Sequence, residues 1–283
     1  MLILPAVKNY DAPIVNTQFG KYPKGSVLSY HQPLENCIIN IYDEIAFPDL
    51  PFENVMQNEY SFVLTESQVV KFEGLKLQIT EIKIFEEQTR LQSLTPLWFR
   101  VRRYRITASH MGEICKRRKN HEALATRLRT SRRCMTAAMR RCHICEPIAG
   151  KAYATKLQKK ANLYPCGVVA NLWSPWIAAS PDRKVYNPER NPPFGLLEIK
   201  CPIVQNIYEV KGLKKDADGQ MKLKRNDNYF YQIMTQMAVT GLKWCDFYVW
   251  WETGDHLEGI FFYDEVWEET KNRADDFYLR YFI

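Results

Sequence analysis

The chain has 283 residues, of which 46% are hydrophobic and 13% aromatic, enough for one large domain or for a domain with an extension. It contains no run of eighteen apolar residues, and its first residues lack the basic start of a secretory signal. We therefore expect no membrane span and a location inside the cell. Eight cysteines without a signal peptide are more typical of reduced thiols than of a disulfide framework.

The net charge of +7 conceals a strong asymmetry along the chain. Residues 100–160 hold eighteen Lys or Arg and three Glu, a surplus of fifteen positive charges, so the remainder is negative by eight. A solvated helical face would normally carry interspersed acids. The block therefore favours a polyanionic partner, and nucleic acid above others.

The first part of the chain differs from the rest. Residues 1–75 are rich in proline and show no sustained helical period, which predicts an irregular extension with a few short strands. We place the domain boundary at residue 80, with an N-terminal extension over 1–80 and a second domain over 81–283. Alternating residues at 75–85 predict a strand, and 86–105 read as a helix with Pro96 in a first turn.

The second domain mixes helical and strand patterns. Thr and Ser capping candidates begin a second helix near residue 106, and 121–160 is predominantly helical. "NYFYQIMTQMAVTG" predicts a helix that Gly241 closes, with Gln232 and Gln236 one turn apart. Further segments are predicted as strands at 163–182, 195–200, 245–251 and 257–263, a polar loop at 214–227 and a terminal helix at 264–283. This order predicts an α/β or α+β domain with a mixed central sheet.

Two charges project from an otherwise apolar strand in "GLLEIKCP". Successive side chains of a strand alternate in direction, so Leu197 and Ile199 share one face, and Glu198 and Lys200 share the other. Buried charges are costly unless they pair or bind a metal. An ion pair on the solvated face of an edge strand would account for Glu198 and Lys200 taken alone.

Two more acids extend this set. Asp182 follows the preceding strand, and Glu146 lies on a helix upstream. Three carboxylates and a lysine suit a hard cation such as Mg²⁺ or Mn²⁺, which prefers oxygen ligands. Metal-assisted phosphodiester cleavage needs such a site, and Lys200 would orient the attacking water or help to deprotonate it.

These motifs, in this order, resemble the PD-(D/E)XK nucleases. The chain as a whole resembles the YqaJ-type viral recombinase family, which includes the alkaline exonucleases of the phage lambda type. Four stretches carry the resemblance: "WFRVRRYRITAS" (98–109), "CEPIAGKAY" (145–153), "SPD…LLEIKCP" (180–202) and "YFYQIMTQMAVTG" (229–241). It implies a restriction-endonuclease-like core in which helices flank a mixed central β-sheet.

The resemblance also implies roles for individual residues. The expected metal ligands are Glu146, Asp182, Glu198 and the backbone carbonyl of Ile199. The expected catalytic lysine is Lys200, and Gln232 would align the site from its helix. The expected contacts to DNA and its 5′-phosphate are Arg102, Ser109, Ser180, Arg105 and Arg183. Arg183 stands where the family usually has glycine, so either the turn after Asp182 differs or Arg183 itself touches DNA.

The predicted activity is that of a Mg²⁺-dependent deoxyribonuclease, with Mn²⁺ as a substitute, that digests duplex DNA 5′→3′ from 5′-phosphorylated ends in recombination or repair. A structure-specific or nonspecific endonuclease and a catalytically weak DNA-binding module are the alternatives. Expected partners are DNA and either further copies of the chain or a single-strand-annealing recombination protein, in the nucleus of a eukaryote or otherwise in the cytoplasm.

The spacing of the cysteines suggests two other kinds of metal site as alternatives. "CHIC" places Cys142 and Cys145 at a zinc-ligand spacing around His143, but no second pair follows, and buried or half-buried thiols are favoured. An iron–sulfur nuclease of the same superfamily would have a cysteine triplet after the core, whereas here only Cys245 follows Cys201.

Overall fold

The centre of the molecule is a mixed five-stranded sheet. The computed structural model describes residues 14–17, 20–23, 46–57, 63–130, 137–158 and 160–283. The strands are arranged in the order β12 (Gly254–Phe261), β11 (Trp244–Trp251), β8 (Phe194–Lys200), β7 (Arg183–Tyr186) and β4 (Asn162–Pro165). The central pair β8–β11 is parallel, and the other neighbours are antiparallel. The predicted mixed sheet is confirmed.

Three smaller sheets accompany it. β3 (Ile106–Thr107), β6 (Ile177–Ala179) and β5 (Val169–Ala170) form one of them. The others are the antiparallel pairs β1 (Ile14–Thr17) with β2 (Gly20–Pro23), and β9 (Leu213–Lys215) with β10 (Met221–Leu223). The segment predicted as a polar loop over 214–227 therefore contains most of a β-hairpin.

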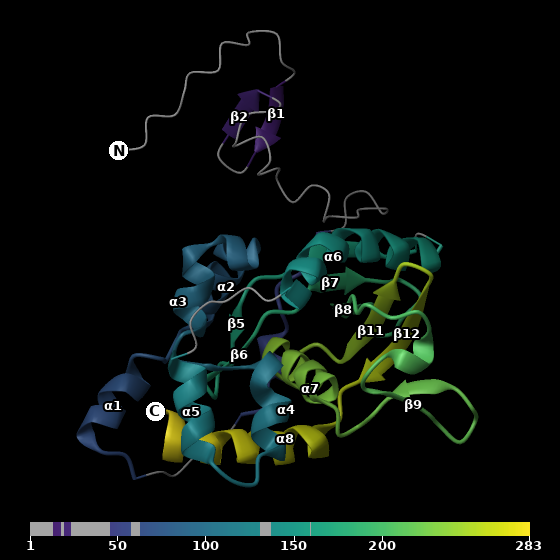
Figure 1. Ribbon diagram of the computed structural model, residues 1–283. Helices are drawn as coiled ribbons and strands as arrows, with labels where there is room; N and C mark the ends of the chain where they lie inside the picture. The colour runs from purple at the N-terminus through teal and green to yellow at the C-terminus, as the bar shows by residue number, and fades with distance from the viewer. Residues whose placement is uncertain (1–13, 18–19, 24–45, 58–62, 131–136, 159) are drawn as a thin grey trace.

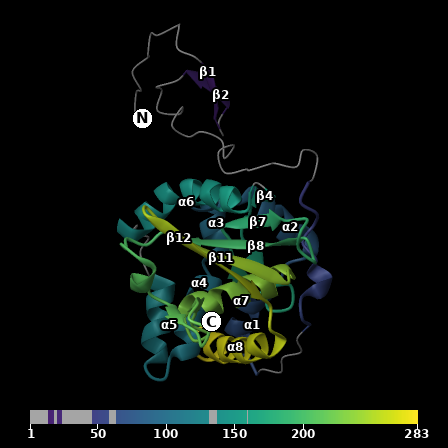
Figure 2. The same ribbon diagram turned by 90° about the vertical axis from the view of Figure 1, so that its right-hand side faces the viewer.

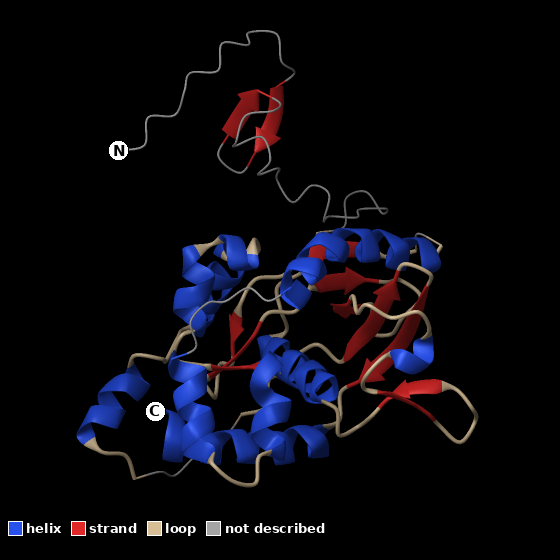
Figure 3. Ribbon diagram, viewed as in Figure 1, coloured by secondary structure: helices blue, strands red, loops and turns tan. Residues whose placement is uncertain are grey.

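Helices cover both faces of the central sheet (Figures 1 and 3). α6 (Ala137–Lys156) lies across one face, and α7 (Asn228–Thr240) lies on the other, with α4 (Ala108–Lys116) and α8 (Asp264–Phe277) beyond it (Figure 2). α8 continues into a terminal π-helical turn, Tyr278–Phe282. α5 (His121–Thr130) contacts this turn. None of the helices in the described ranges is long and apolar enough to cross a bilayer.

The alternation predicted for β8 is confirmed. Leu197 and Ile199 are buried with Tyr153 of α6 in one hydrophobic cluster. Leu196 belongs to the separate cluster that contains Ile233 of α7. The strand is thus buried on both faces, which makes it a central strand and removes the reading of Glu198 as an exposed edge residue.

The prediction of a strand over 75–85 is wrong. Most of this segment forms α2 (Ile79–Gln88), which begins with a capping box between Gln78 and Glu81. Reciprocal capping satisfies two backbone amides at a helix start and outweighs a short run of alternating residues. The single helix predicted over 86–105 is also broken. A 3₁₀ turn, Gln92–Leu94, separates α2 from α3 (Pro96–Arg102), whose first residue is the predicted proline.

Part of the predicted extension joins the main core. Leu50, Phe52 and Val55 are buried there, and α1 (Glu66–Glu73) contributes Phe72. Gly241 ends α7 at φ 76°, as its position predicted, and a Cβ there would lie 2.1 Å from the carbonyl oxygen of Pro51. The boundary at residue 80 stays a prediction.

Candidate active site

The site lies where β7 and β8 diverge. Their pairing ends at Arg183 and Leu197, and Asp182 stands just before it. The Asp182 carboxylate accepts a hydrogen bond of 2.7 Å from the backbone N–H of Ile199, which ties the start of β7 to the end of β8. Burial raises the pKa of Asp182 well above its usual value, and the negative charges of Glu198 and Glu146 raise it further. Three acids are therefore close enough to repel one another.

Glu198 is held by α7 and by its own strand. It is 1% exposed, and its two carboxylate oxygens accept hydrogen bonds from the side-chain amides of Gln232 (2.6 Å) and Gln236 (2.7 Å). Lys200 forms an ion pair with the same carboxylate. The predicted placement of Gln232 is observed. Gln236 carries an equal share of the contact, and its spacing of four residues from Gln232 was the available signal.

Lys200 completes this cluster. Its ammonium lies 4.7 Å from the ring centre of Tyr229, on the first turn of α7. Burial opposes the charge, but Glu198 and Asp182 outweigh it and raise the pKa of Lys200 above its usual value. The group is therefore an ammonium that can donate hydrogen bonds and orient an oxygen nucleophile, and it is poorly suited to remove a proton.

Glu146 and Arg183 occupy the other side of the site. Glu146 comes from α6, and its carboxylate lies 2.6 Å from a guanidinium nitrogen of Arg183, whose side chain is 7% exposed. Arg183 was predicted to contact DNA or to alter the turn after Asp182. The structure turns it inward, where the buried guanidinium of Arg183 has the half-buried Glu146 carboxylate as its counter-charge.

The acidic side chains of the site supply oxygen atoms of the kind that a divalent cation binds. Across the described ranges, no group of three or more His, Cys, Asp or Glu side chains is arranged to hold a metal ion. Protein donors occupy oxygens of Asp182, Glu198 and Glu146. The chemistry nevertheless suits a hard cation, because three carboxylates lie near one another, and the charges of Glu198 and Glu146 raise the pKa of Asp182.

A second group lies beside Asp182. The Ser180 hydroxyl accepts hydrogen bonds from a guanidinium nitrogen of Arg102 (3.2 Å) and from the indole nitrogen of Trp98 (3.0 Å). The Arg102 guanidinium lies 3.8 Å from the Trp98 ring centre, as expected for a tryptophan beneath the arginine. Burial lowers the pKa of Arg102 to about 10, so it stays charged at neutral pH. Arg102 and Ser180 are thus brought together.

The other predicted phosphate and DNA contacts are placed differently. Ser109 is exposed on the first turn of α4, within hydrogen-bonding distance of the Thr107 hydroxyl (3.2 Å). Arg105 is buried, and its guanidinium donates to the carbonyl oxygens of Pro175, Val101 and Leu75. Its hydrogen bonds hold the chain together, so we leave Arg105 out of the proposed DNA contacts.

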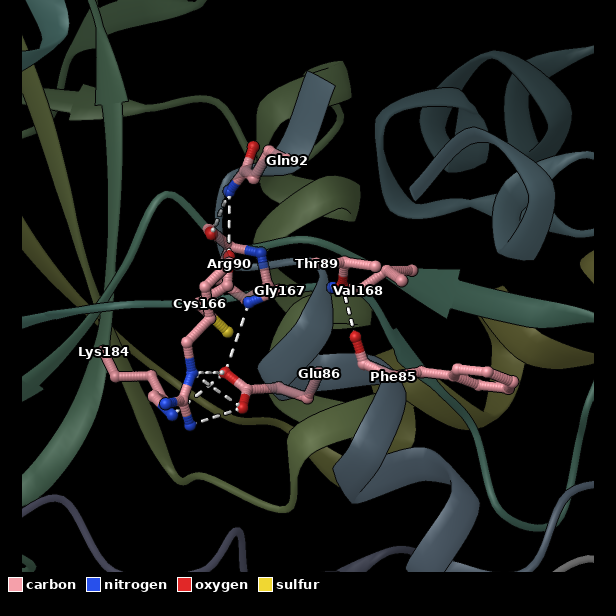
Figure 4. Close-up of polar contacts among 10 residues, drawn as sticks. Phe85, Glu86, Thr89, Arg90, Gln92, Cys166, Gly167, Val168 and Lys184 are labelled. Atoms are coloured by element: carbon pink, nitrogen blue, oxygen red, sulfur yellow. Dashed lines mark hydrogen bonds and ion pairs between the residues drawn. The ribbon is translucent and has the colours of Figure 1, made fainter. Parts of the chain in front are cut away.

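A polar network supports β7, the strand that begins directly after Asp182, and Figure 4 shows its hydrogen bonds and ion pairs. Glu86 of α2 is 4% exposed and accepts hydrogen bonds from Arg90 (2.7 Å) and from Lys184 of β7 (3.0 Å). Burial opposes the Glu86 charge, but these two cations outweigh it and lower the pKa of Glu86. Gln92 donates to the carbonyl oxygens of Cys166 (3.1 Å) and Pro181 (3.0 Å), and Pro181 directly precedes Asp182.

Cysteine side chains lie near Lys200. A hydrogen bond with the Cys201 thiol lowers the pKa of Cys142 to about 7. Cys145 is buried in the cluster between α6 and the sheet. The side chain of His143 lies outside the described residues. Cys142 is half-buried and Cys145 is buried, as predicted, and the zinc alternative stays an alternative.

The chain is similar in sequence and in fold to known proteins. The family model of the YqaJ-like viral recombinase domain matches residues 97–243. The alkaline exonuclease LHK-Exo from Laribacter hongkongensis is similar at 26% identity with a TM-score of 0.52, over 65% of this chain and 90% of that one. Its complex with dAMP is matched over the same shares at 25% identity and a TM-score of 0.53. No curated protein sequence matches the chain.

Proposed function

Because the chain belongs to the YqaJ-like viral recombinase domain family, we propose that it is a Mg²⁺-dependent deoxyribonuclease. The proposed reaction is hydrolysis of phosphodiester bonds in duplex DNA, 5′→3′ from ends that carry a 5′-phosphate. The fold likeness to LHK-Exo, an alkaline exonuclease solved with dAMP, supports an exonuclease over an endonuclease or a passive DNA-binding module. We place this activity inside the cell, in the nucleus of a eukaryote or the cytoplasm otherwise.

One observation carries the proposal: Asp182, Glu198 and Lys200 converge where two central strands separate. A surface that only bound DNA would gain nothing from placing two acids close to the DNA phosphates, because like charges repel. A divalent cation bound by Asp182, Glu198, Glu146 and the Ile199 carbonyl would neutralise charge on the phosphate and lower the pKa of an attacking water.

The residues of this chain have separate tasks in that reaction. Gln232 and Gln236 hold the Glu198 carboxylate in one orientation through its two oxygens. The Lys200 ammonium donates a hydrogen bond that orients the water. Arg102 and Ser180 bind the terminal phosphate, since a guanidinium is suited to a phosphate group. Trp98 stacks below Arg102 and restricts its motion.

The decisive experiment incubates linear and circular duplex DNA with the protein in Mg²⁺, Mn²⁺ or EDTA. We expect linear DNA to be degraded in either metal, circular DNA to persist, and EDTA to stop the reaction. Cleavage of circular DNA would indicate an endonuclease, and no cleavage of either substrate would leave a binding module. Lys200→Ala is the control, and undiminished cleavage by this variant would refute the site.

A further inference from the structure

The β9–β10 hairpin carries a concentration of positive charge outside the candidate active site. Six cations lie on it or at its base: Lys211, Lys214, Lys215, Lys222, Lys224 and Arg225. Only Asp216 and Asp218 oppose them in the same segment. The strand register sets Lys214 directly opposite Lys222. Like charges directly opposite each other destabilise an antiparallel pair, so the arrangement calls for an anionic partner.

This charge is not neutralised within the described part of the protein. None of the six cations forms an ion pair with a carboxylate of the described residues. Asp216 is used by the turn, where its carboxylate accepts hydrogen bonds from the backbone N–H groups of Asp218 (3.0 Å) and Gln220 (2.8 Å). The hairpin differs in this from Arg117, at the C-terminal cap of α4, which pairs with Glu113.

Aromatic rings hold two of the cations in place. The Lys215 ammonium lies 5.4 Å from the ring centre of Tyr208, which is 68% exposed. The Arg225 guanidinium lies 4.7 Å from the ring centre of Phe230 and 5.1 Å from that of Tyr263. Cation–π contacts restrict these long side chains while leaving their charge available to a further anion.

The base of the hairpin is joined to the active-site helix. The Lys224 N–H donates to the Gly212 carbonyl (2.8 Å), and the Leu223 N–H donates to the buried Glu258 carboxylate (2.6 Å). Asp227 then caps α7 by accepting from the Tyr229 N–H, and Tyr229 is the ring under Lys200. Figure 1 shows the hairpin extending outward from this anchored base. The charges of the hairpin therefore lie outside the cleavage site, but the hairpin is joined to α7, which carries residues of that site.

We propose that a hairpin surface, made by Lys214, Lys215, Lys222 and Arg225, binds the phosphate backbone of duplex DNA beyond the nucleotide being cleaved. The choice of DNA rests on the proposed function. A duplex is favoured over a single strand because the hairpin surface offers positive charges, which suit phosphates. An unpaired base would need an open aromatic ring on which to stack, but Lys215 lies over the Tyr208 ring. Such contacts hold a substrate without reading its sequence.

The test measures binding separately from cleavage. Fluorescence anisotropy of a labelled 5′-phosphorylated duplex is followed in EDTA, in an Asp182→Asn background, over a series of salt concentrations. Lys214→Gln/Lys222→Gln removes two phosphate contacts, so the slope of log K against log salt should fall by about 1.8. Lys214→Arg/Lys222→Arg keeps both charges and should retain the slope.

A matched control removes two lysines elsewhere. Lys76→Gln/Lys83→Gln deletes the same charge from residues that already pair with Glu73 and Asp49, and it should leave the slope unchanged. An unchanged slope in the hairpin variant, or an equal fall in the control, would overturn the proposal. A fall seen with single-stranded DNA or RNA but absent with the duplex would overturn it as well. Failure of the proposed nuclease would show instead as absent metal-dependent cleavage by the unmodified protein.

Discussion

Two clusters of acids and cations lie on either side of β7. The pKa of the central carboxylate is lowered in one cluster and raised in the other. Behind the strand, Glu86 is matched by Arg90 and Lys184, and these cations lower its pKa. At the start of the strand, Asp182 lies near Glu198 and Glu146, and burial together with these acids raises its pKa. In the Glu86 cluster, neighbouring cations of the protein compensate the negative charge. In the Asp182 cluster, the negative charge exceeds what the neighbouring groups compensate.

This difference distinguishes a carboxylate that stabilises the fold from one that is kept for a function. A buried carboxylate that only supports the fold gains a full set of donors and becomes more acidic. A carboxylate kept among other acids is costly in the free protein, and such a cost persists where a function requires it. The excess at Asp182 is what a bound cation would neutralise.

The largest effect is expected from Asp182→Asn, which removes a charge but keeps an oxygen for the Ile199 N–H. We expect cleavage of linear duplex DNA in Mg²⁺ to fall by about 10³-fold, within the range for a group acting directly in catalysis. The folded protein should become more stable by roughly 1 kcal/mol, because the raised pKa means that the charged form disfavours folding. Urea unfolding in EDTA measures this change in stability. A loss of stability in Asp182→Asn would contradict the proposed difference between the two clusters.

Glu86→Gln tests the other cluster and should cost about 3–5 kcal/mol of stability, because it leaves the buried Lys184 without its counter-charge. The lowered pKa of Glu86 determines how its contribution to stability changes with pH. The stabilising contribution of the carboxylate is present above its unfolded pKa of about 4.5 and is lost as the pH falls through the lower folded value. Unfolding of the wild type and the variant at pH 7 and pH 3 should therefore show a gap that narrows in acid.

The sequence allowed part of this comparison to be predicted. The alternation of β8 and the Gly241 cap of α7 depend on neighbouring residues, so both were predictable and are confirmed. The family resemblance also grouped Arg102 with Ser180, and the two side chains are in contact, whereas their role in phosphate binding stays a prediction.

What the sequence did not reveal depends on distant pairing. Lys184 meets Glu86 across 98 positions, and the inward turn of Arg183 depends on Glu146, 37 positions earlier. The helical identity of α2 was readable in principle, since Gln78 and Glu81 form a capping box, but the alternating residues before it favoured a strand. No local rule pairs charges that lie on separate elements.

A smaller and more selective effect is expected at the phosphate group. Arg102→Ala removes a charge-assisted contact of about 1.5–3 kcal/mol, or roughly 10- to 100-fold in kcat/KM. The loss should appear on 5′-phosphorylated duplexes and be slight on 5′-hydroxyl duplexes, which can be compared with end-labelled substrates. An equal loss on both ends would place Arg102 outside terminal-phosphate binding and favour an endonuclease.

The smallest effect is expected where the two clusters are joined. Gln92 reaches from the α2 side to the Pro181 carbonyl, so it positions Asp182 without contacting DNA. Gln92→Ala loses two hydrogen bonds of about 1 kcal/mol each, and we expect kcat to fall by about tenfold because Asp182 moves. Gln92 also has φ 47°, which favours glycine, so Gln92→Gly removes the amide while relieving the backbone. If the glycine variant keeps full activity while the alanine variant loses it, the backbone conformation carries the effect. If both lose kcat equally, the hydrogen bond to Pro181 links the structural cluster to the site.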